Sequence, residues 1–167
     1  VFTIFDDGDK MALVRESMES LNIDQKRFQA RDVLNAISRA KEKLVLPDEY
    51  HKYFAGALEA VAGPVYRAYQ EKLAANHALD FDDLILYTVH LLRLSAEARE
   101  HYQQRFHYIL VDEYQDINFA QYVLVRTLAE KHKNVFCVGD DDQSIYRWRG
   151  ADVGIILQFE SDYPDAT

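Results

Sequence analysis

The sequence predicts an α/β protein in two parts: an all-α subdomain over residues 1–79 and part of a parallel β-sheet with helices over residues 80–167. Two short apolar runs in the second part, Tyr108–Val111 and Val135–Val138, have the length and composition of strands buried on both faces of a parallel sheet. The stretch between them has a helical pattern, and strand, helix and strand joined by short links are typical of a βαβ unit with a right-handed crossover. The residues before position 80 show helical periodicity alone, which predicts the all-α part.

The first part is expected to consist of successive helices. In the first helix, Met11, Val14, Met18 and Leu21 recur at helical spacing after Asp9, which we expect to be the N-cap. The remaining helices are expected over Val33–Leu44, which Pro47 follows, over Asp48–Ala55, and through Val65–Leu73, where Gly63–Pro64 either starts or kinks the helix.

The second part begins with a helix that has one apolar face from Phe81 to Leu92, and Asp80 and Asp83 are placed to cap its start. The other helices are expected from the cap Ser95 through Arg105, over Phe119–His132 between the strands, and over Asp152–Tyr163 at the tail. Two strands alone do not form a stable sheet that is covered on both faces, so we expect the chain to be a fragment of a longer domain.

The composition is typical of a soluble, globular, cytoplasmic protein. With 167 residues, 49% apolar and 28% charged, the chain is long enough to bury a core, and we expect neither a membrane span nor a signal peptide. The only cysteine, Cys137, sits in an apolar run, so we expect a structural thiol in a reducing cytoplasm. The six histidines lack ligand spacing, so no transition-metal site is expected.

The net charge of −9 argues against simple binding to a nucleic-acid backbone, whose usual footprint is basic. The sign is not uniform, because one basic stretch contains six cations and two acids: Lys26, Arg27, Arg31, Arg39, Lys41 and Lys43 against Asp32 and Glu42. A solvated helix face is the favoured interpretation of this basic stretch, and a surface that faces DNA is the alternative.

Two adjacent carboxylates, Asp112 and Glu113, directly follow the first apolar run. Ligands of open α/β sheets bind beyond the carboxyl ends of the strands, and Mg²⁺ takes one or two carboxylates while it keeps several waters. We therefore interpret Asp112 as a metal ligand and Glu113 as the residue that orients or deprotonates an attacking water. A strand that ends in solvated surface acids accounts for these two residues equally well.

A polar segment, Gly139–Ala151, follows the second apolar run, and its Gln143 is placed to reach a terminal phosphate from the end of the strand. Two aromatic residues then alternate with two arginines: Tyr146, Arg147, Trp148 and Arg149. This mixture suits single-stranded nucleic acid, because aromatic rings stack on bases and guanidinium groups contact phosphates. Taken alone, the segment is better interpreted as a buried Tyr–Trp pair with two surface arginines.

Two segments closely resemble signature motifs of the superfamily 1A DNA helicases: Val111–Asp116 (VDEYQD) and Val138–Ala151 (VGDDDQSIYRWRGA). The resemblance is to the UvrD/Rep/PcrA group, with PcrA-type enzymes nearest, and it covers essentially the whole chain, including Leu79–Leu84 (LDFDDL). It implies a central fragment of such a helicase. The helical part would be the 1B subdomain, and the rest would be the Walker B to motif III part of the RecA-like, P-loop NTPase-type domain 1A.

The resemblance also implies roles for individual residues. Asp112 matches the acid that holds Mg²⁺, Glu113 matches the catalytic carboxylate, and Gln143 matches the glutamine that contacts the γ-phosphate and couples it to DNA. The DNA path is expected to contain Tyr146, Arg149 and Trp148, on whose ring a base of the tracking strand stacks.

The implied cofactors are ATP and Mg²⁺. The implied partners are single-stranded DNA, a duplex junction, the rest of the helicase, and accessory repair or replication proteins. We expect Gln115 and Asp116 to support the motif rather than to take part in the chemistry.

The chain departs from the family in one respect: none of its six glycines is followed by lysine, so it contains no phosphate-cradling G-x-x-x-x-G-K-[S/T] loop. We therefore expect the isolated chain to be inactive, and the ATP-dependent 3′-to-5′ helicase or translocase activity, in repair or replication, to belong to a longer parent protein. The alternatives are a fragment of an AddA/RecB-type helicase–nuclease and a non-catalytic, truncated helicase module that binds DNA or a protein.

Overall fold

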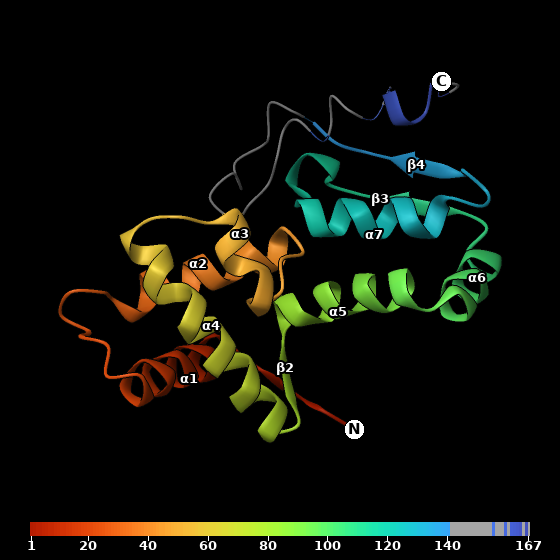
Figure 1. Cartoon of the computed structure of the whole chain (residues 1–167). Coiled ribbons are helices and arrows are strands. Elements are labelled where there is room, and N and C mark those ends of the chain that lie inside the picture. Colours follow the sequence, from red (N-terminus) through yellow and green to blue (C-terminus); the bar gives the residue numbers. More distant parts are fainter. Residues whose placement is uncertain (141–154, 156–158, 160, 165, 167) are drawn as a thin grey trace. The chain divides into compact units, whose positions relative to one another are not determined.

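The computed structural model of the chain describes residues 1–140, 155, 159, 161–164 and 166 (Figure 1). The chain divides into two compact units, Val1–Leu84 and Ile85–Thr167. Both combine helices with a small parallel sheet, so the chain is an α/β protein. Within the described residues, no helix is long and apolar enough to cross a membrane.

The first unit is a helical core with a two-stranded parallel sheet at its side (Figure 1). Its elements are β1 (Thr3–Phe5), α1 (Asp7–Ser20), α2 (Ala30–Glu42), the 3₁₀ helix η1 (Pro47–Glu49), α3 (Tyr50–Tyr53), α4 (Ala57–Ala75), β2 (Ala78–Asp80) and the start of α5 (Phe81–Leu94). Helices α1, α2 and α4 pack on one another through fully buried side chains such as Val14, Val33 and Val65. Burial of this apolar surface provides the main stabilisation of the unit.

The start of α1 differs from the sequence prediction, because its N-cap is Asp6 and not Asp9. The Asp6 carboxylate accepts hydrogen bonds from the backbone N–H groups of Gly8 and Asp9, at 2.8 and 3.0 Å. Asp9 in turn accepts one from the Asp6 N–H at 3.2 Å, which completes a capping box. Since two aspartates at this spacing satisfy each other's backbone groups, the helix begins one turn earlier than expected.

Helix α4 runs through Pro64, so the interpretation in which Gly63–Pro64 starts this helix is wrong. The purely helical interpretation of the first part is also wrong, because β1 and β2 pair in parallel with Thr3 opposite Ala78 and Phe5 opposite Asp80. Each of these strands has only three residues, which is too short to show a period of two in the sequence.

A buried ionic centre joins α2 to the junction of β2 and α5. The Nζ atom of Lys41, whose side chain is 0% exposed, lies 2.6 Å from Asp80 Oδ2 and 2.8 Å from Asp83 Oδ1. The Tyr69 hydroxyl donates a hydrogen bond to Asp80 Oδ2 at 2.8 Å, and Gln70 Nε2 donates one to Asp83 Oδ1 at 3.1 Å. Lys41 therefore belongs to the core and not to the solvated or DNA-facing surface that the sequence predicted for the basic stretch.

The two aspartates of this centre also cap α5, as expected. The Asp83 N–H donates to Asp80 Oδ1 at 2.8 Å, and the Asp80 N–H donates to Asp83 Oδ2 at 3.2 Å. Burial opposes ionisation of Asp80, but the charge of Lys41 and the hydrogen bonds from it and from Tyr69 lower the pKa of this carboxyl below its usual value. One lysine thus sets the positions of both the end of β2 and the start of α5.

The second unit contains the predicted strand–helix–strand arrangement. Its elements are the rest of α5, α6 (Ala96–Arg105), β3 (Ile109–Val111), the 3₁₀ helix η2 (Tyr114–Asp116), α7 (Phe119–Ala129) and β4 (Val135–Cys137). Strands β3 and β4 are parallel, with Val111 opposite Cys137, which confirms the predicted pairing. The Ser95 hydroxyl accepts a hydrogen bond from the Ala98 N–H at 3.1 Å, so the predicted cap of α6 is also confirmed.

The prediction that these strands are buried on both faces is wrong for the described part of the chain. The side of the sheet on which Val111 and Cys137 lie packs against a core that contains Tyr114. On the other side Leu110 and Phe136, which are partners in the register, are 75% and 62% exposed. None of the described elements covers this second face.

We predict that Lys41→Met lowers the free energy of unfolding of the first unit by about 3–5 kcal/mol, because it leaves two buried carboxylates without their cation. The measurement is the amide hydrogen exchange of α2 and α4, which reports the opening of this unit separately. Lys26→Ala, which removes an exposed lysine of the same unit, should change this free energy by no more than about 0.5 kcal/mol. Equal effects of the two variants would contradict the role assigned to Lys41.

Glu42 should make the first unit less stable as the pH rises. Burial, followed by repulsion from Asp82, raises the pKa of Glu42 from 4.5 to about 7. The folded state therefore holds this proton more tightly than the unfolded state, so its contribution to stability is full below the unfolded pKa and is lost as the pH rises towards about 7.

Glu42→Gln should remove this loss, so the variant should gain thermal stability relative to the original chain between about pH 5 and pH 8. Glu71→Gln, which removes an exposed carboxylate from α4, tests whether loss of charge alone has this effect. Parallel melting-temperature profiles for the original chain and Glu42→Gln would refute the assignment.

Candidate functional site

The parallel pairing of β3 and β4 brings two polar segments to one edge of the sheet. Asp112 and Glu113 follow the last residue of β3, and Gly139 and Asp140 come soon after β4. Backbone hydrogen bonds continue the pairing past the strands, from Val138 N to Val111 O at 2.8 Å and from Tyr114 N to Val138 O at 2.9 Å. The carboxyl ends of parallel strands are where open α/β sheets bind their ligands.

Asp112 and Glu113 are both exposed, whereas the next two residues, Tyr114 and Gln115, are buried. Asp112 Oδ1 accepts a hydrogen bond from the Glu113 N–H at 2.9 Å. Glu113 has φ 51° and ψ 42°, the left-handed conformation that non-glycine residues rarely adopt. Such a backbone costs about 1–3 kcal/mol and persists where the surroundings enforce it, often at functional sites.

Glu113 is held by the short helix η2. Its carbonyl oxygen accepts a hydrogen bond from the Asp116 N–H at 2.9 Å, and its Oε2 accepts one from Gln115 Nε2 at 2.6 Å. Gln115 is only 2% exposed, and its Oε1 accepts a hydrogen bond from the Asp140 N–H at 3.0 Å. The site thus consists of two solvent-facing carboxylates, and the buried side chain of Gln115 supports Glu113 by a hydrogen bond.

These residues suit a hard cation bound together with an anionic ligand. The described residues contain no group of three or more His, Cys, Asp or Glu side chains that could hold a metal by themselves. Mg²⁺ does not need such a cage, because it is commonly held by one or two carboxylates, water molecules and substrate phosphates. The exposed Asp112 carboxylate fits that coordination, and Glu113 lies beside it with its carboxylate already oriented.

Comparison with known proteins identifies the family of the chain. The family model of the UvrD/REP helicase N-terminal domain matches residues 1–164. The chain belongs to the UvrD/Rep helicase family. It is 49% identical over 166 residues to the ATP-dependent DNA helicase PcrA of Bacillus subtilis, and 49% and 48% identical over 165 residues to the PcrA proteins of Staphylococcus epidermidis and Staphylococcus aureus.

These matches include 99% of this chain but only 22–23% of the length of each PcrA protein. The chain therefore spans less than a quarter of the curated helicases that it resembles. The activity of those whole helicases comes to this chain only as a proposal.

Several predicted site residues of this helicase segment lie outside the described residues. They are Gln143, Tyr146, Trp148 and Arg149. The roles of Gln143 in nucleotide contact and of the other three in DNA binding stay predictions. The described part of the site consists of Asp112, Glu113 and their supporting residues.

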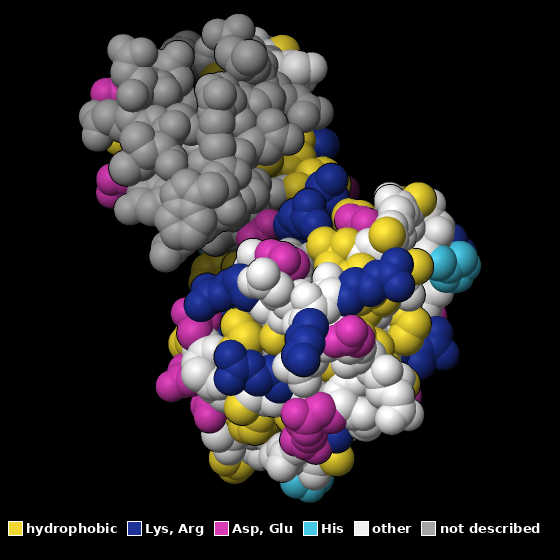
Figure 2. Space-filling view, turned by 90° about the vertical axis from the view of Figure 1, so that its left-hand side faces the viewer, with side chains coloured by type: hydrophobic (Ala, Val, Ile, Leu, Met, Phe, Trp, Pro, Cys, Tyr) yellow, Lys and Arg dark blue, Asp and Glu magenta, His cyan; other side chains and the backbone are white. Residues whose placement is uncertain are grey.

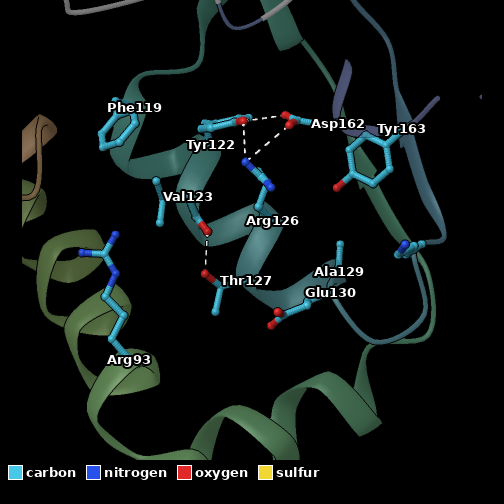
Figure 3. Close-up of a pocket in the computed structure, with 11 residues that line it drawn as sticks. Arg93, Phe119, Tyr122, Val123, Arg126, Thr127, Ala129, Glu130, Asp162 and Tyr163 are labelled. Carbon is cyan, nitrogen blue, oxygen red and sulfur yellow. Dashed lines mark hydrogen bonds and ion pairs between the residues drawn. The ribbon is translucent and has the colours of Figure 1, made fainter. Parts of the chain in front are cut away.

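Another feature of the second unit is a hollow of about 560 Å³ beside α7 (Figure 3). Tyr122 donates a hydrogen bond to Asp162, and Arg126 Nη1 lies 3.0 Å from the Tyr122 hydroxyl and 3.4 Å from Asp162 Oδ1. Neither Asp112 nor Glu113 lines the hollow. Because Arg126 is already paired, we assign the hollow no part in the chemistry.

Cys137 does not act as a nucleophile in this geometry. It is the last residue of β4 and packs against the core of the second unit. Burial raises the pKa of its thiol to about 11, so the thiolate is scarce at neutral pH.

The charged surface of the first unit is mixed in sign. Figure 2 shows Lys and Arg side chains interspersed with Asp, Glu and hydrophobic side chains on one face of this unit. Five cations of the basic stretch are exposed: Lys26, Arg27, Arg31, Arg39 and Lys43. Arg39 lies 3.8 Å from Glu59, so part of this surface charge is neutralised locally.

Sequence reasoning missed how closely Gln115 is integrated into the site. The sequence predicted only a supporting role for this residue, whereas the structure connects it to both Glu113 and Asp140. No pattern in the sequence indicated this connection, because the burial of Gln115, which makes a partner necessary, is known only from the structure.

Proposed function

We propose that this chain is part of an ATP-dependent DNA helicase or translocase that moves 3′ to 5′. Within that protein, the chain would supply the carboxylates for ATP hydrolysis. The observation that supports this proposal best is the exposed pair Asp112 and Glu113 at the end of β3, with Glu113 in a left-handed conformation held by a buried amide. Family membership and identity to PcrA point to the same chemistry. We further propose that the whole protein acts in DNA repair or replication.

In this proposal Asp112 holds Mg²⁺, which when bound neutralises charge on the nucleotide phosphates. Glu113 orients a water molecule and accepts its proton as the water attacks the terminal phosphate. The Glu113 carboxylate suits this step because its oxygens can accept a hydrogen bond from the water. Its fixed backbone limits the orientations that it can adopt, which favours productive geometry.

We propose that the segment after β4 connects this chemistry to DNA. Gln143 would contact the γ-phosphate, and a base of single-stranded DNA would stack on Trp148 beside Tyr146 and Arg149. Base stacking on an aromatic ring contributes about 1–3 kcal/mol per base and tolerates any sequence. The duplex junction and accessory proteins would be contacted by the assembled helicase.

The catalytic assignment predicts the behaviour of a hybrid in which this chain replaces the matching segment of Bacillus subtilis PcrA, to which it is 49% identical. Glu113→Gln keeps the size of the side chain and removes the base, so we expect DNA-stimulated ATP hydrolysis by the hybrid to fall about 10²–10⁴-fold. The measurement is steady-state phosphate release with saturating Mg²⁺, ATP and oligo-dT.

The matched control is Glu100→Gln, which removes an exposed carboxylate from α6 of the same unit and should leave hydrolysis unchanged. The isolated chain has no Gly-Lys phosphate loop, so we expect it to release no phosphate. Full hydrolysis by the Glu113→Gln hybrid would contradict the catalytic assignment, and an inactive original hybrid would favour a non-catalytic module.

The DNA assignment predicts that oligo-dT quenches the fluorescence of Trp148, the only tryptophan of the chain. Quenching should saturate and should weaken as salt is added, because contacts to phosphates release counterions. The measurement is a titration of the purified chain at low and moderate salt, repeated with the hybrid carrying Trp148→Leu to give the background signal. Unchanged Trp148 emission in both the chain and the original hybrid would rule out base stacking at this position.

A further inference from the structure

The side-chain amide of Gln115 connects the segment that follows β3 to the segment that follows β4. Its Nε2 donates to Glu113 Oε2 at 2.6 Å, and its Oε1 accepts from the Asp140 N–H at 3.0 Å. Glu113 precedes Gln115 by two residues, whereas Asp140 lies beyond β4. The contact with Asp140 therefore joins two segments that are distant in sequence. The Gln115 side chain is only 2% exposed, whereas its two partners, Glu113 and Asp140, are exposed.

The side-chain amide of Gln115 meets two opposite requirements at this position. A carboxylate accepts hydrogen bonds and a backbone N–H donates them, so one end of the residue at position 115 must donate and the other must accept. The chemistry of the two partners therefore fixes which way the amide is turned. Methionine has the size of glutamine and makes neither bond, whereas glutamate makes only the bond to Asp140.

Gly139 provides the space that Gln115 occupies. A Cβ atom at position 139 would lie 2.7 Å from Gln115 Oε1 and 3.2 Å from its backbone N. Contacts below 3.0 Å are not sustained, so the Gln115 side chain would have to move. A methyl group at position 139 therefore disturbs the amide while Gln115 itself stays in the sequence.

We propose that Gln115 is a positioning residue that holds the Glu113 carboxylate and ties its orientation to the backbone of Asp140. This inference rests on the proposed function, since it affects hydrolysis only if Glu113 is the catalytic carboxylate. Asp140 lies in the segment that leads to Gln143. A shift of that backbone is thus transmitted to Glu113 through one side chain.

The test uses the PcrA hybrid described above, with three variants: Gln115→Met, Gly139→Ala and the double variant Glu113→Gln/Gln115→Met. We expect Gln115→Met and Gly139→Ala each to lower kcat about ten- to a hundredfold and to leave the KM for ATP unchanged, because they misorient a catalytic group without removing a nucleotide contact. In the Glu113→Gln background, Gln115→Met should cause no further loss, because the group that it positions is gone.

Gln103→Met is the matched control. Gln103 is also a buried glutamine of the second unit, and its Nε2 donates to Thr127 O at 2.6 Å and to Glu130 Oε2 at 3.1 Å. Its loss should lower the melting temperature as that of Gln115 does, while kcat stays at the value of the original hybrid. This comparison separates a loss of stability from a loss of positioning.

A second measurement tests the contact itself and does not depend on ATP hydrolysis. In the isolated chain, the Asp140 amide should exchange with solvent faster in Gln115→Met than in the original sequence, as measured by ¹⁵N–¹H NMR, while Gln103→Met leaves it unchanged. Unaltered Asp140 exchange in Gln115→Met would overturn the inference.

The kinetic outcomes separate the two claims. If Glu113→Gln abolishes hydrolysis but Gln115→Met lowers kcat no more than Gln103→Met does, the positioning role is overturned and the proposed function stands. If Glu113→Gln leaves hydrolysis intact, the proposed function is contradicted and the positioning role falls with it.

Discussion

The parallel pairing of β3 with β4 is the constraint on which the candidate site depends. With Val111 opposite Cys137, the residues that follow the two strands emerge at the same edge of the sheet. A shift of one residue in this register would turn every side chain of the shifted strand to the opposite face and separate Glu113 from Asp140. The backbone bonds of Val138 and Tyr114 extend the pairing past both strands, so the geometry of the carboxylates is determined by the sheet rather than by a free loop.

In the first unit, a buried ion pair joins the helical core to the end of β2 and the start of α5. The cation of Lys41 lies between the Asp80 and Asp83 carboxylates, and the two aspartates also satisfy each other's backbone N–H groups. Removing charges from water is costly, and it is offset here because the cation, a tyrosine hydroxyl and a glutamine amide surround the carboxylates. The LDFDDL segment therefore has a structural explanation, independent of nucleotide or DNA, for its first and last aspartates.

Much of the second unit could be predicted from the sequence, because its signals are local. The apolar runs identified β3 and β4, and Ser95 marked the start of α6. The misses depended on contacts that are distant in sequence or on backbone conformation. Lys41 looked like a surface cation because its partners are about forty residues away, β1 and β2 are too short to show a pattern, and no pattern of residue types predicts the left-handed backbone of Glu113. The type and position of the adjacent acids Asp112 and Glu113 predicted them as site residues, but the amide that connects Glu113 to Asp140 required the structure.

The most direct measurement is a crystal structure of the PcrA hybrid with Mg²⁺ and a non-hydrolysable ATP analogue. The account predicts the metal beside Asp112, either bound directly or through one water, with the Glu113 carboxylate facing the terminal phosphate and still bonded to Gln115. A nucleotide bound away from the carboxyl ends of β3 and β4, or a Glu113 carboxylate turned away from the terminal phosphate, would contradict the account.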